Sequence, residues 1–160
     1  MATNVLDIDT QNAEVSFKVK KLGLITIKGS IAGFTGEISF DEGALDKSHF
    51  NVCVSPSTIN TGNTKRDEHL KSRDFFYVNK HPNICFESTT VRSNAQGHQA
   101  VGKLSMLGFS KEISIPFSSD SGSFQGEFGL NRSDFNLGDK FPAFIVGKTI
   151  HISISFKVKK

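Results

Sequence analysis

Apolar and polar residues alternate along most of this chain of 160 residues. The clearest run is 150–158, where Ile, Phe and Val occupy every second position against His, Ser and Lys. A period of two is typical of a β-strand with one dry face. Similar runs occur at 15–20, 25–40, 52–56, 84–91, 102–106, 113–117 and 124–130, and Gly, Pro, Asn, Asp and Ser mark the turns between them. Regular short strands with turns between them predict an all-β sandwich or barrel, forming one domain over residues 1–160.

A closed barrel is the favoured architecture. About eight antiparallel strands enclose an interior that just holds one small ligand, and closure removes the edges along which β-proteins aggregate. Within 25–40 the parity of the apolar positions changes at Gly33-Phe34, between Gly29 and Gly36. A parity change flanked by glycines predicts a bulge or tight bend in a strongly curved sheet. The strand that starts at residue 52 is expected to end at Pro56.

One stretch, 57–76, breaks the alternation and predicts a short helix. Thr64 is a candidate N-cap because its hydroxyl accepts from a free backbone N–H of the first turn, and Asp67 completes a T-x-x-D start that resembles a capping box. Asp67 and Lys71 are one turn apart, in the favourable order for an ion pair. Leu70 is the large apolar residue of this turn, and Phe75-Phe76 follow it. We expect Leu70, Phe75 and Phe76 to close one end of the lumen as a lid.

The aromatic residues are 15 Phe, 1 Tyr and no Trp. Phe has no polar group that needs a partner, so it suits an interior without hydrogen-bond partners. A solid Phe-filled core explains this composition, and so does a cavity that stays apolar for a ligand. The candidate lumen residues lie on one side of their predicted strands or belong to the lid. They are Phe17, Val19, Ile27, Phe34, Ile38, Phe40, Leu70, Phe75, Phe76, Phe86, Leu104, Met106, Ile113, Ile115, Phe117, Phe128, Ile152, Ile154 and Phe156.

The charge pattern excludes some classes of partner. The net charge is +3, and Lys and Arg are scattered rather than set beside stacking aromatics, so we expect no nucleic acid.

No apolar run approaches the ~18 residues of a transmembrane helix. The opening residues 1–4 have neither the basic nor the apolar region of a signal peptide. The expectation is a cytoplasmic protein as the chain stands, or a periplasmic one if a signal has been removed.

The two cysteines, Cys53 and Cys85, lack the spacing of a zinc site, and one possible disulfide does not make a disulfide scaffold. We expect small buried or half-buried thiols, and the sequence leaves open whether they pair. The 5 His residues have no metal-ligand spacing either. We therefore expect no metal and no cofactor.

The polar residues of the predicted helix suggest two kinds of chemistry. His69, Asp67 and Ser72 could be taken for a catalytic triad, but all three lie on one short stretch without a Gly-flanked nucleophile. We expect no catalytic residue. Arg66 either anchors the helix to the barrel rim or, together with Asn63, meets a lipid head group such as a phosphate.

The motif T-x-N-x-x-R-D-x-H-L-K-S-x-D-F-F, from Thr61 to Phe76, closely resembles the signature of the YceI family of lipocalin-like β-barrels. The segments IKGSIAGFTGEISFD (27–41), PNICFES (82–88), 101–111 and NRSDF (131–135) are similar to further blocks of that family. Many members carry a His where this chain has Lys21, which leaves a polar role at that edge open. The resemblance implies an extended eight-stranded antiparallel lipocalin-like barrel with a short helix between strands. It further implies a polyisoprenoid or similar amphiphile in the lumen, often a dimer, and commonly a periplasmic location.

Two functional hypotheses follow. The first is non-enzymatic binding, storage or transport of a long apolar lipid, such as a polyisoprenoid or isoprenoid quinone, in the lumen. The alternative is a filled barrel without ligand, whose outer face or edge forms a homodimer. The final strand motivates the alternative because its outward residues His151, Ser153 and Ser155 carry little charge to protect an edge.

Overall fold

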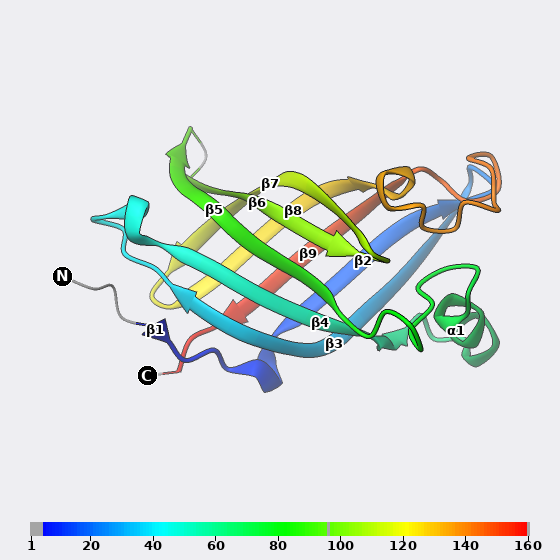
Figure 1. The fold of residues 1–160 in the computed structure, drawn as a ribbon, viewed down its shortest axis with the longest axis horizontal. Coiled ribbons are helices and arrows are strands. Elements are labelled where there is room, and N and C mark those ends of the chain that lie inside the picture. Colours follow the sequence, from blue (N-terminus) through cyan, green and yellow to red (C-terminus); the bar gives the residue numbers. More distant parts are fainter. Residues whose placement is uncertain (1–4, 96, 160) are drawn as a thin grey trace.

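Eight long antiparallel strands form a closed, elongated barrel in the computed structural model, which describes residues 5–95 and 97–159 (Figure 1). Gln96, Lys160 and the opening residues 1–4 lie outside the described part. The strands are β1 (Val5–Leu6), β2 (Glu14–Lys21), β3 (Ile25–Ser39), β4 (His49–Asn60), β5 (Ile84–Asn94), β6 (Gly97–Met106), β7 (Phe109–Asp120), β8 (Ser123–Asn131) and β9 (Thr149–Lys157). The α-helix is α1 (Thr64–Lys71), and short 3-10 turns are η1 (Thr10–Asn12), η2 (Leu45–Lys47) and η3 (Arg132–Phe135).

The strand order around the barrel is β3-β2-β9-β8-β7-β6-β5-β4, and β3 pairs with β4 to close it. The short β1 adds to β3 at Ser39 and Ile38. This confirms the predicted eight-stranded antiparallel barrel with one short helix. The last strand, β9, pairs with β2 on one side and β8 on the other. The idea that β9 offers an edge for dimerisation is therefore wrong, because its backbone groups are already used in the sheet.

The bend predicted in 25–40 is confirmed in β3. The β3–β4 register shifts between Ser30 and Ala32 and again between Ala32 and Thr35. Gly33 and Gly36 have φ of +75° and +131°, which L side chains rarely adopt. A Cβ on Gly36 would also lie 2.1 Å from the carbonyl oxygen of Asn51. The two glycines therefore allow one long strand to serve two differently oriented parts of the wall.

Strand β4 does not end at Pro56 as the sequence suggested. It runs on to Asn60, and Pro56 is fully buried within it. Its β5 pairing ends at Val54 and its β3 pairing is interrupted between Ser55 and Asn60. Proline has no backbone N–H to donate. It is therefore tolerated at a strand position where no carbonyl of a neighbouring strand would accept that hydrogen bond.

Helix α1 begins one residue from the predicted cap. Asn63, in extended conformation, is the N-cap, and its Oδ1 accepts from the Arg66 N–H at 3.0 Å. Thr64 is thus the first helical residue rather than the cap. Asp67 is not paired with Lys71, because its Oδ1 accepts from the backbone N–H and hydroxyl of Thr61 at 2.9 and 2.6 Å. Lys71 instead pairs with Glu68 at 3.3 Å.

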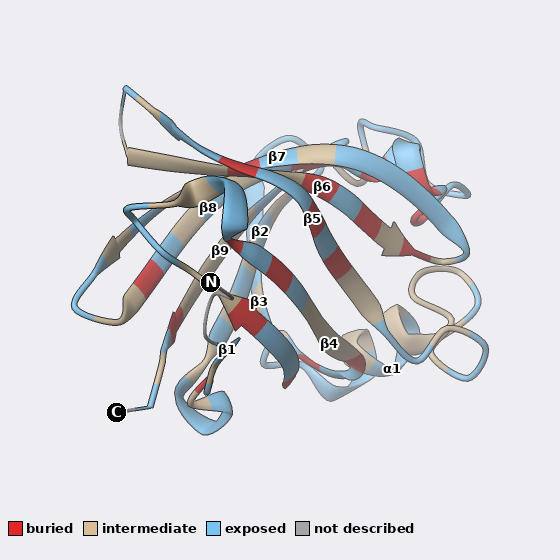
Figure 2. Cartoon of the chain, turned by 60° about the vertical axis from the view of Figure 1, so that its left-hand side comes forward, coloured by how far each residue is buried: buried red, intermediate tan, exposed pale blue. Residues whose placement is uncertain are grey.

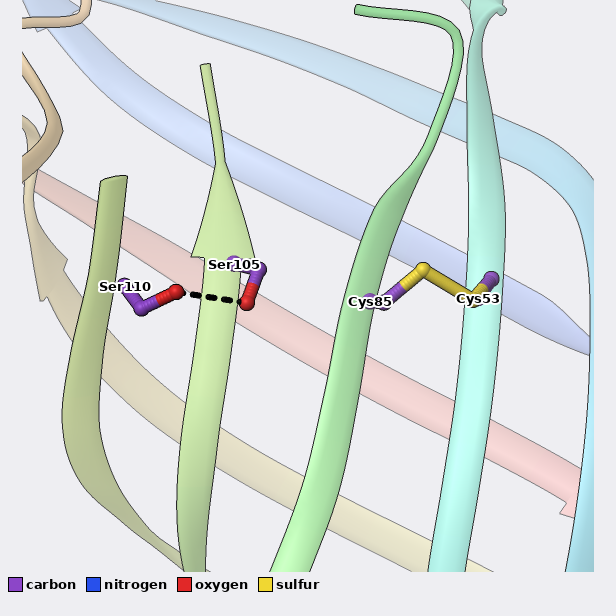
Figure 3. The surroundings of a disulfide bond; sticks show 4 residues. All are labelled: Cys53, Cys85, Ser105 and Ser110. Atoms are coloured by element: carbon purple, nitrogen blue, oxygen red, sulfur yellow. Dashed lines mark hydrogen bonds between the residues drawn. A yellow bond between two sulfur atoms is a disulfide. The ribbon is translucent and has the colours of Figure 1, made fainter. Parts of the chain in front are cut away.

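The two cysteines form a disulfide, so the expectation of free thiols is wrong. Cys53 on β4 and Cys85 on β5 stand directly opposite each other. Figure 3 shows the bridge in the wall, in line with a Ser105–Ser110 hydroxyl contact of 2.9 Å on β6 and β7. The sulfur bridge closes a loop of sequence separation 32 that contains all of α1 and the segment 72–83. Both ends of the predicted lid are therefore tied to each other at the barrel rim.

The interior differs between the two ends of the barrel. Buried positions recur along the strands, as period-two alternation requires (Figure 2). At the end that carries β1 and the last residues of β9, the rings of Phe40, Phe50, Phe117 and Phe124 contact one another. We call this the closed end. At the opposite end α1 and the segment 132–148 cover the opening (Figure 1), and we call this the lid end.

Candidate functional site

A cavity of about 150 Å³ lies inside the barrel beneath the lid. Its walls are aliphatic and aromatic side chains from β2, β3, β4, β5, β6, β7, β8 and β9, together with the two cysteines Cys53 and Cys85, and Arg132 is the charged residue among them. A second chamber of about 60 Å³ adjoins it toward the closed end, where Phe50, Phe117 and Phe124 line it. Phe34 and Phe86 line both chambers. The interior therefore offers an apolar space that continues from the lid toward the aromatic cluster.

The lid covers this cavity with rings from two segments. Leu70, Phe75 and Phe76 line the cavity from above. The Phe75 ring stacks on the Phe141 ring with centroids 5.1 Å apart, and the His69 ring meets both edge-on. These contacts join α1 and the residues after it to the loop 138–147.

A small polar cluster holds the same two segments together on the outside. His69 Nε2 lies 2.9 Å from Asp74 Oδ2, and Lys140 Nζ lies 3.4 Å from the same oxygen. The hydrogen bond from His69 lowers the pKa of Asp74 most, and Lys140 lowers it further, while burial opposes them. Ionised Asp74 thus links the lid to the loop 138–147.

Arg132 holds the loop 138–147 in place from inside the rim. The residue is only 4% exposed, and all five of its N–H donors are used on backbone carbonyls. Nε donates to Gly147, Nη1 to Leu137 and Gly138, and Nη2 to Phe141 and Val146, at 2.6–3.0 Å. Burial lowers the pKa of Arg132, and the negative charge of Asp139 opposes this.

Arg66 and Asn63, the two candidate head-group residues, lie on the first turn of α1 and do not line the cavity. Arg66 Nε donates to the hydroxyl of Thr61 and Nη2 to its carbonyl, each at 2.8 Å. Asn63 caps the helix. These contacts tie α1 to the end of β4, and a head-group role for either residue stays a prediction.

The polar residues considered as a triad make separate contacts. Asp67 bonds to Thr61, His69 to Asp74, and the Ser72 hydroxyl to the carbonyl of His69 at 2.5 Å. Within residues 5–95 and 97–159, no three His, Cys, Asp or Glu side chains gather to hold a metal ion. No helix of the described part is long and apolar enough to cross a membrane.

Comparison with known proteins agrees with this architecture. The model of the YceI-like domain matches residues 6–158. The chain belongs to the YceI-like family. Among its relatives is a UPF0312 protein of Yersinia enterocolitica, 30% identical over 142 residues, which cover 82% of this chain and 74% of the relative. A UPF0312 protein of Pectobacterium atrosepticum is likewise 30% identical over 141 residues, covering 82% and 73% of the two chains.

Solved structures share this YceI-like fold at low identity. BcnA of Burkholderia cenocepacia superimposes with a TM-score of 0.87 at 20% identity, covering 96% of this chain and 100% of BcnA. A polyisoprenoid binding domain from Saccharophagus degradans superimposes with a TM-score of 0.71 at 11% identity, covering 98% and 99% of the two chains. At such identities the likeness establishes the fold.

The YceI-like barrel places most of the candidate lumen residues around its two chambers. Those that line the main cavity are Phe17, Val19, Phe34, Leu70, Phe75, Phe76, Phe86, Leu104, Met106, Ile115, Phe128, Ile152 and Ile154. Phe117 and Phe156 line the second chamber. Ile27, Ile38, Phe40 and Ile113 line neither chamber. Ile38 and Phe40 lie beyond the bend of β3, where they pack into the closed end, and Ile27 on β3 and Ile113 on β7 are half-buried.

Several cavity residues of this YceI-like chain were not among the candidates. Val15, Ile31, Val52, Val54, Ile84, Leu130 and Ile150 line the main cavity from the strands. The alternation of apolar positions could have identified most of them. Arg132, Leu137 and Val146 also line it, but they belong to η3 and the loop after it. A loop has no residue period, so the alternation marks none of these three, and the block NRSDF that contains Arg132 pointed to the family and not to a place in the cavity.

Proposed function

We propose that this protein binds an apolar, chain-like lipid in the barrel lumen and performs no chemistry on it. The observation that carries the proposal is the apolar cavity beneath the lid. The family membership supports it, as does the fold likeness to a domain described as polyisoprenoid binding. A chain of isoprene units needs no hydrogen bonds along its length, which matches walls built of Val, Leu, Ile, Met and Phe.

The affinity of such a site comes from removing apolar surface from water. Each buried CH₂ contributes about 0.8 kcal/mol, so affinity rises with every unit of chain that enters the lumen. The buried guanidinium of Arg132 stands at the rim, where a polar lipid end would stay while the chain enters.

The size of the cavity requires the lid to move. A cavity of about 150 Å³ in another protein accommodates one benzene molecule. The space beneath the lid has about this volume, so it holds about one isoprene unit as folded. A longer chain enters only if lining side chains move apart. Helix α1 is the suitable mobile part, since none of its residues is buried and it rests on the barrel through Leu70 and the rings that follow.

Mass spectrometry of an organic extract of the purified protein tests the proposal directly. The delipidated protein is then given isoprenoid alcohols of increasing length, with saturated chains as comparison. We expect a bound isoprenoid or similar long-chain lipid in the extract, and affinity that rises with chain length until the lumen is full. An empty extract together with no uptake of any chain would contradict the proposal. A dimer in sedimentation under those conditions would favour the ligand-free interaction module.

A matched pair of variants locates the binding in the lumen. Val54→Phe adds a ring inside the cavity, whereas Val5→Phe adds the same ring on β1, where Val5 is 61% exposed. We expect Val54→Phe to weaken uptake about tenfold, equivalent to ~1.4 kcal/mol, and Val5→Phe to leave it unchanged. Equal uptake by both variants would place the lipid outside the lumen.

The Cys53–Cys85 bridge supports an oxidising compartment, such as the periplasm, as the site of action. Disulfides persist in such compartments and are rare in a reducing cytoplasm. Cell fractionation followed by thiol labelling tests this part of the proposal. Labelling of both cysteines without prior reduction, in a cytoplasmic fraction, would contradict it.

A further inference from the structure

Large hydrophobic side chains are exposed together at one place on the barrel. Leu22 and Leu24 lie on the turn between β2 and β3, Ile25 is the first residue of β3, and Phe144 lies on the loop 138–147. Leu24 is 87% exposed and Phe144 is 73% exposed. We call these four residues the rim patch. Single exposed hydrophobic residues are ordinary, but a group of them marks a site of interaction.

The two segments of the rim patch are fixed to each other. The Leu22 N–H donates to the carbonyl of Ile145 at 3.0 Å, and the Gly147 N–H donates to the carbonyl of Lys20 at 2.8 Å. Lys21 and Val146 also form a β-bridge. The β2–β3 turn and the loop 138–147 are therefore one surface, and Figure 1 shows both at the same end of the barrel.

Five lysines surround the rim patch or follow it along the strands: Lys18, Lys20, Lys21, Lys28 and Lys148. The sequence contains no Asp or Glu in the stretches 15–36 and 140–150, and Asp139 is the acidic residue of the loop 138–147. Lys18 and Lys28 stand directly opposite each other on β2 and β3, an arrangement that destabilises a sheet. In the described part of the chain, none of the five forms an ion pair. Glu127 shares the outer groove with Lys18 and Lys28, and its Oε1 accepts from the Ser153 hydroxyl at 3.4 Å.

We propose that the rim patch docks the barrel onto the surface of a bilayer that contains anionic phospholipid. Leu24 and Phe144 would enter the interface, and the lysines would lie at the level of the negatively charged head groups. Exposed apolar residues flanked by Lys are the pattern of proteins that lie on a membrane surface, and long Lys side chains keep their charge at the head groups.

The charge pattern favours a bilayer over a second copy of this chain. Two rim patches facing each other would bring two sets of lysines together, and like charges across an interface oppose association. An anionic surface instead relieves the repulsion between Lys18 and Lys28. The rim patch adjoins the loop that Arg132 holds, so docking would bring the lid end to the membrane, where a lipid is available.

Co-sedimentation with vesicles tests the docking. The purified protein is mixed with vesicles of phosphatidylcholine and phosphatidylglycerol in equal parts, or of phosphatidylcholine alone. We expect binding to the anionic vesicles that weakens with added salt, and little binding to the neutral ones. The double variant Lys20→Gln/Lys21→Gln should bind about thirtyfold more weakly, since each Lys near such a surface contributes about fivefold. The control variant Lys47→Gln/Lys157→Gln removes the same charge at the closed end. The logarithm of its fold-change in vesicle binding should be less than half of that of Lys20→Gln/Lys21→Gln.

The apolar part is tested by Leu24→Ser/Phe144→Ser, with Val5→Ser as the matched control at the closed end. We expect the first variant to lose vesicle binding while it still takes up isoprenoid into the lumen, and the control to bind vesicles normally. Retained uptake separates failure of docking from failure of the proposed lipid site. Vesicle binding that is unchanged in the first variant would overturn the proposal. A concentration-dependent dimer that Leu24→Ser dissociates, without vesicle binding, would also overturn it and identify the rim patch as a self-association surface.

Discussion

The closed end and the lid end of this barrel are built from the same alternating strands, yet they are filled to different extents, with a chamber of about 60 Å³ at the aromatic cluster and a cavity of about 150 Å³ beneath the lid. At the closed end Phe124 has four ring neighbours, and its ring stacks on that of Phe156 with centroids 5.0 Å apart. At the lid end the inward positions of β2 and β4 are mostly valines, such as Val15, Val19 and Val54, which leave the cavity between them. Phenylalanine rings line both chambers, so the difference in volume follows from how closely the rings pack against one another at the closed end rather than from the strand pattern.

Removing a ring from each end gives the largest expected contrast. Phe124→Ala should lower the free energy of unfolding by about 3–5 kcal/mol, because Phe124 is buried and its loss leaves a cavity. Phe76→Ala should cost only about 1–2 kcal/mol, because the ring is half-buried in the lid, but it should reduce lipid uptake more than Phe124→Ala does. Urea unfolding and uptake assays measure the two effects. Equal losses of stability would mean that the lid is a fixed part of the core.

The lid end relies on a covalent bond where the closed end relies on packing. The variant Cys53→Ser/Cys85→Ser should lose about 3–4 kcal/mol of stability, the value expected for closing a loop of sequence separation 32 in the unfolded chain. Hydrogen exchange should rise most in α1 and in 72–83, because these segments lie inside that loop. If exchange rises equally at the closed end, the bridge stabilises the whole barrel rather than the lid.

Arg132 is the polar support of the lid end, whereas the polar side chain in contact with the aromatic cluster is His98, whose ring meets Phe40 and Phe117. Arg132→Lys should cost about 2–3 kcal/mol, since lysine has three donors and leaves buried carbonyls of the loop 138–147 without partners. Arg92→Lys is the matched control, because Arg92 is exposed on β5. Thermal unfolding measures both variants. A loss no larger than that of the control would show that the loop keeps its conformation without the planar guanidinium.

The smallest expected effect concerns pH. Because the pKa of Asp74 is lowered in the folded protein, its contribution is complete above the pKa of the unfolded chain, about 4, and is lost as pH falls through the lower folded value. Wild type should therefore open its lid more slowly than Asp74→Asn at pH 6, and the two should converge in strong acid. The rate of uptake of a fluorescent isoprenoid, measured across this range, checks the convergence. A difference that does not shrink as the pH is lowered into strong acid would assign the effect to the amide itself.

The sequence predicted the local features of the fold better than the contacts between distant segments. The period of two located the strands, and Gly33 and Gly36 located the bend, because both are properties of neighbouring residues. The cap was misplaced by one position, since Asn63 and Thr64 are both good N-caps and the choice depends on how the chain leaves β4. The Cys53–Cys85 bridge depends on the register between β4 and β5, and the whole lid separates these strands in the sequence. No local pattern predicts that register.

The candidate site was predictable to the same extent. Lumen residues on strands follow from alternation, and the lid residues Leu70, Phe75 and Phe76 follow from apolar residues beside a polar helix. The bend of β3 removed Ile38 and Phe40 from the cavity, because beyond it the wall turns toward the closed end. Arg132 was not among the candidates because its hydrogen-bond partners are backbone carbonyl oxygens. Every residue has such an oxygen, so the sequence does not show which of them converge on the guanidinium.

The pairing of β2 with β9 has a consequence for biosynthesis. One edge of residues 14–18 pairs with residues 151–155, so it stays unpaired until β9 has been synthesised. The barrel therefore cannot close until nearly all of the chain has been made. Nascent chains with an open strand edge are prone to aggregate, and such distant pairings fold slowly. The segments 7–9 and 157–159 lie side by side, joined by the Asp9–Lys157 and Lys159–Asp7 backbone hydrogen bonds. A circular permutant opened in the turn between β7 and β8 would therefore synthesise β8, β9, β1, β2 and β3 in succession, and would form this seam early instead of last.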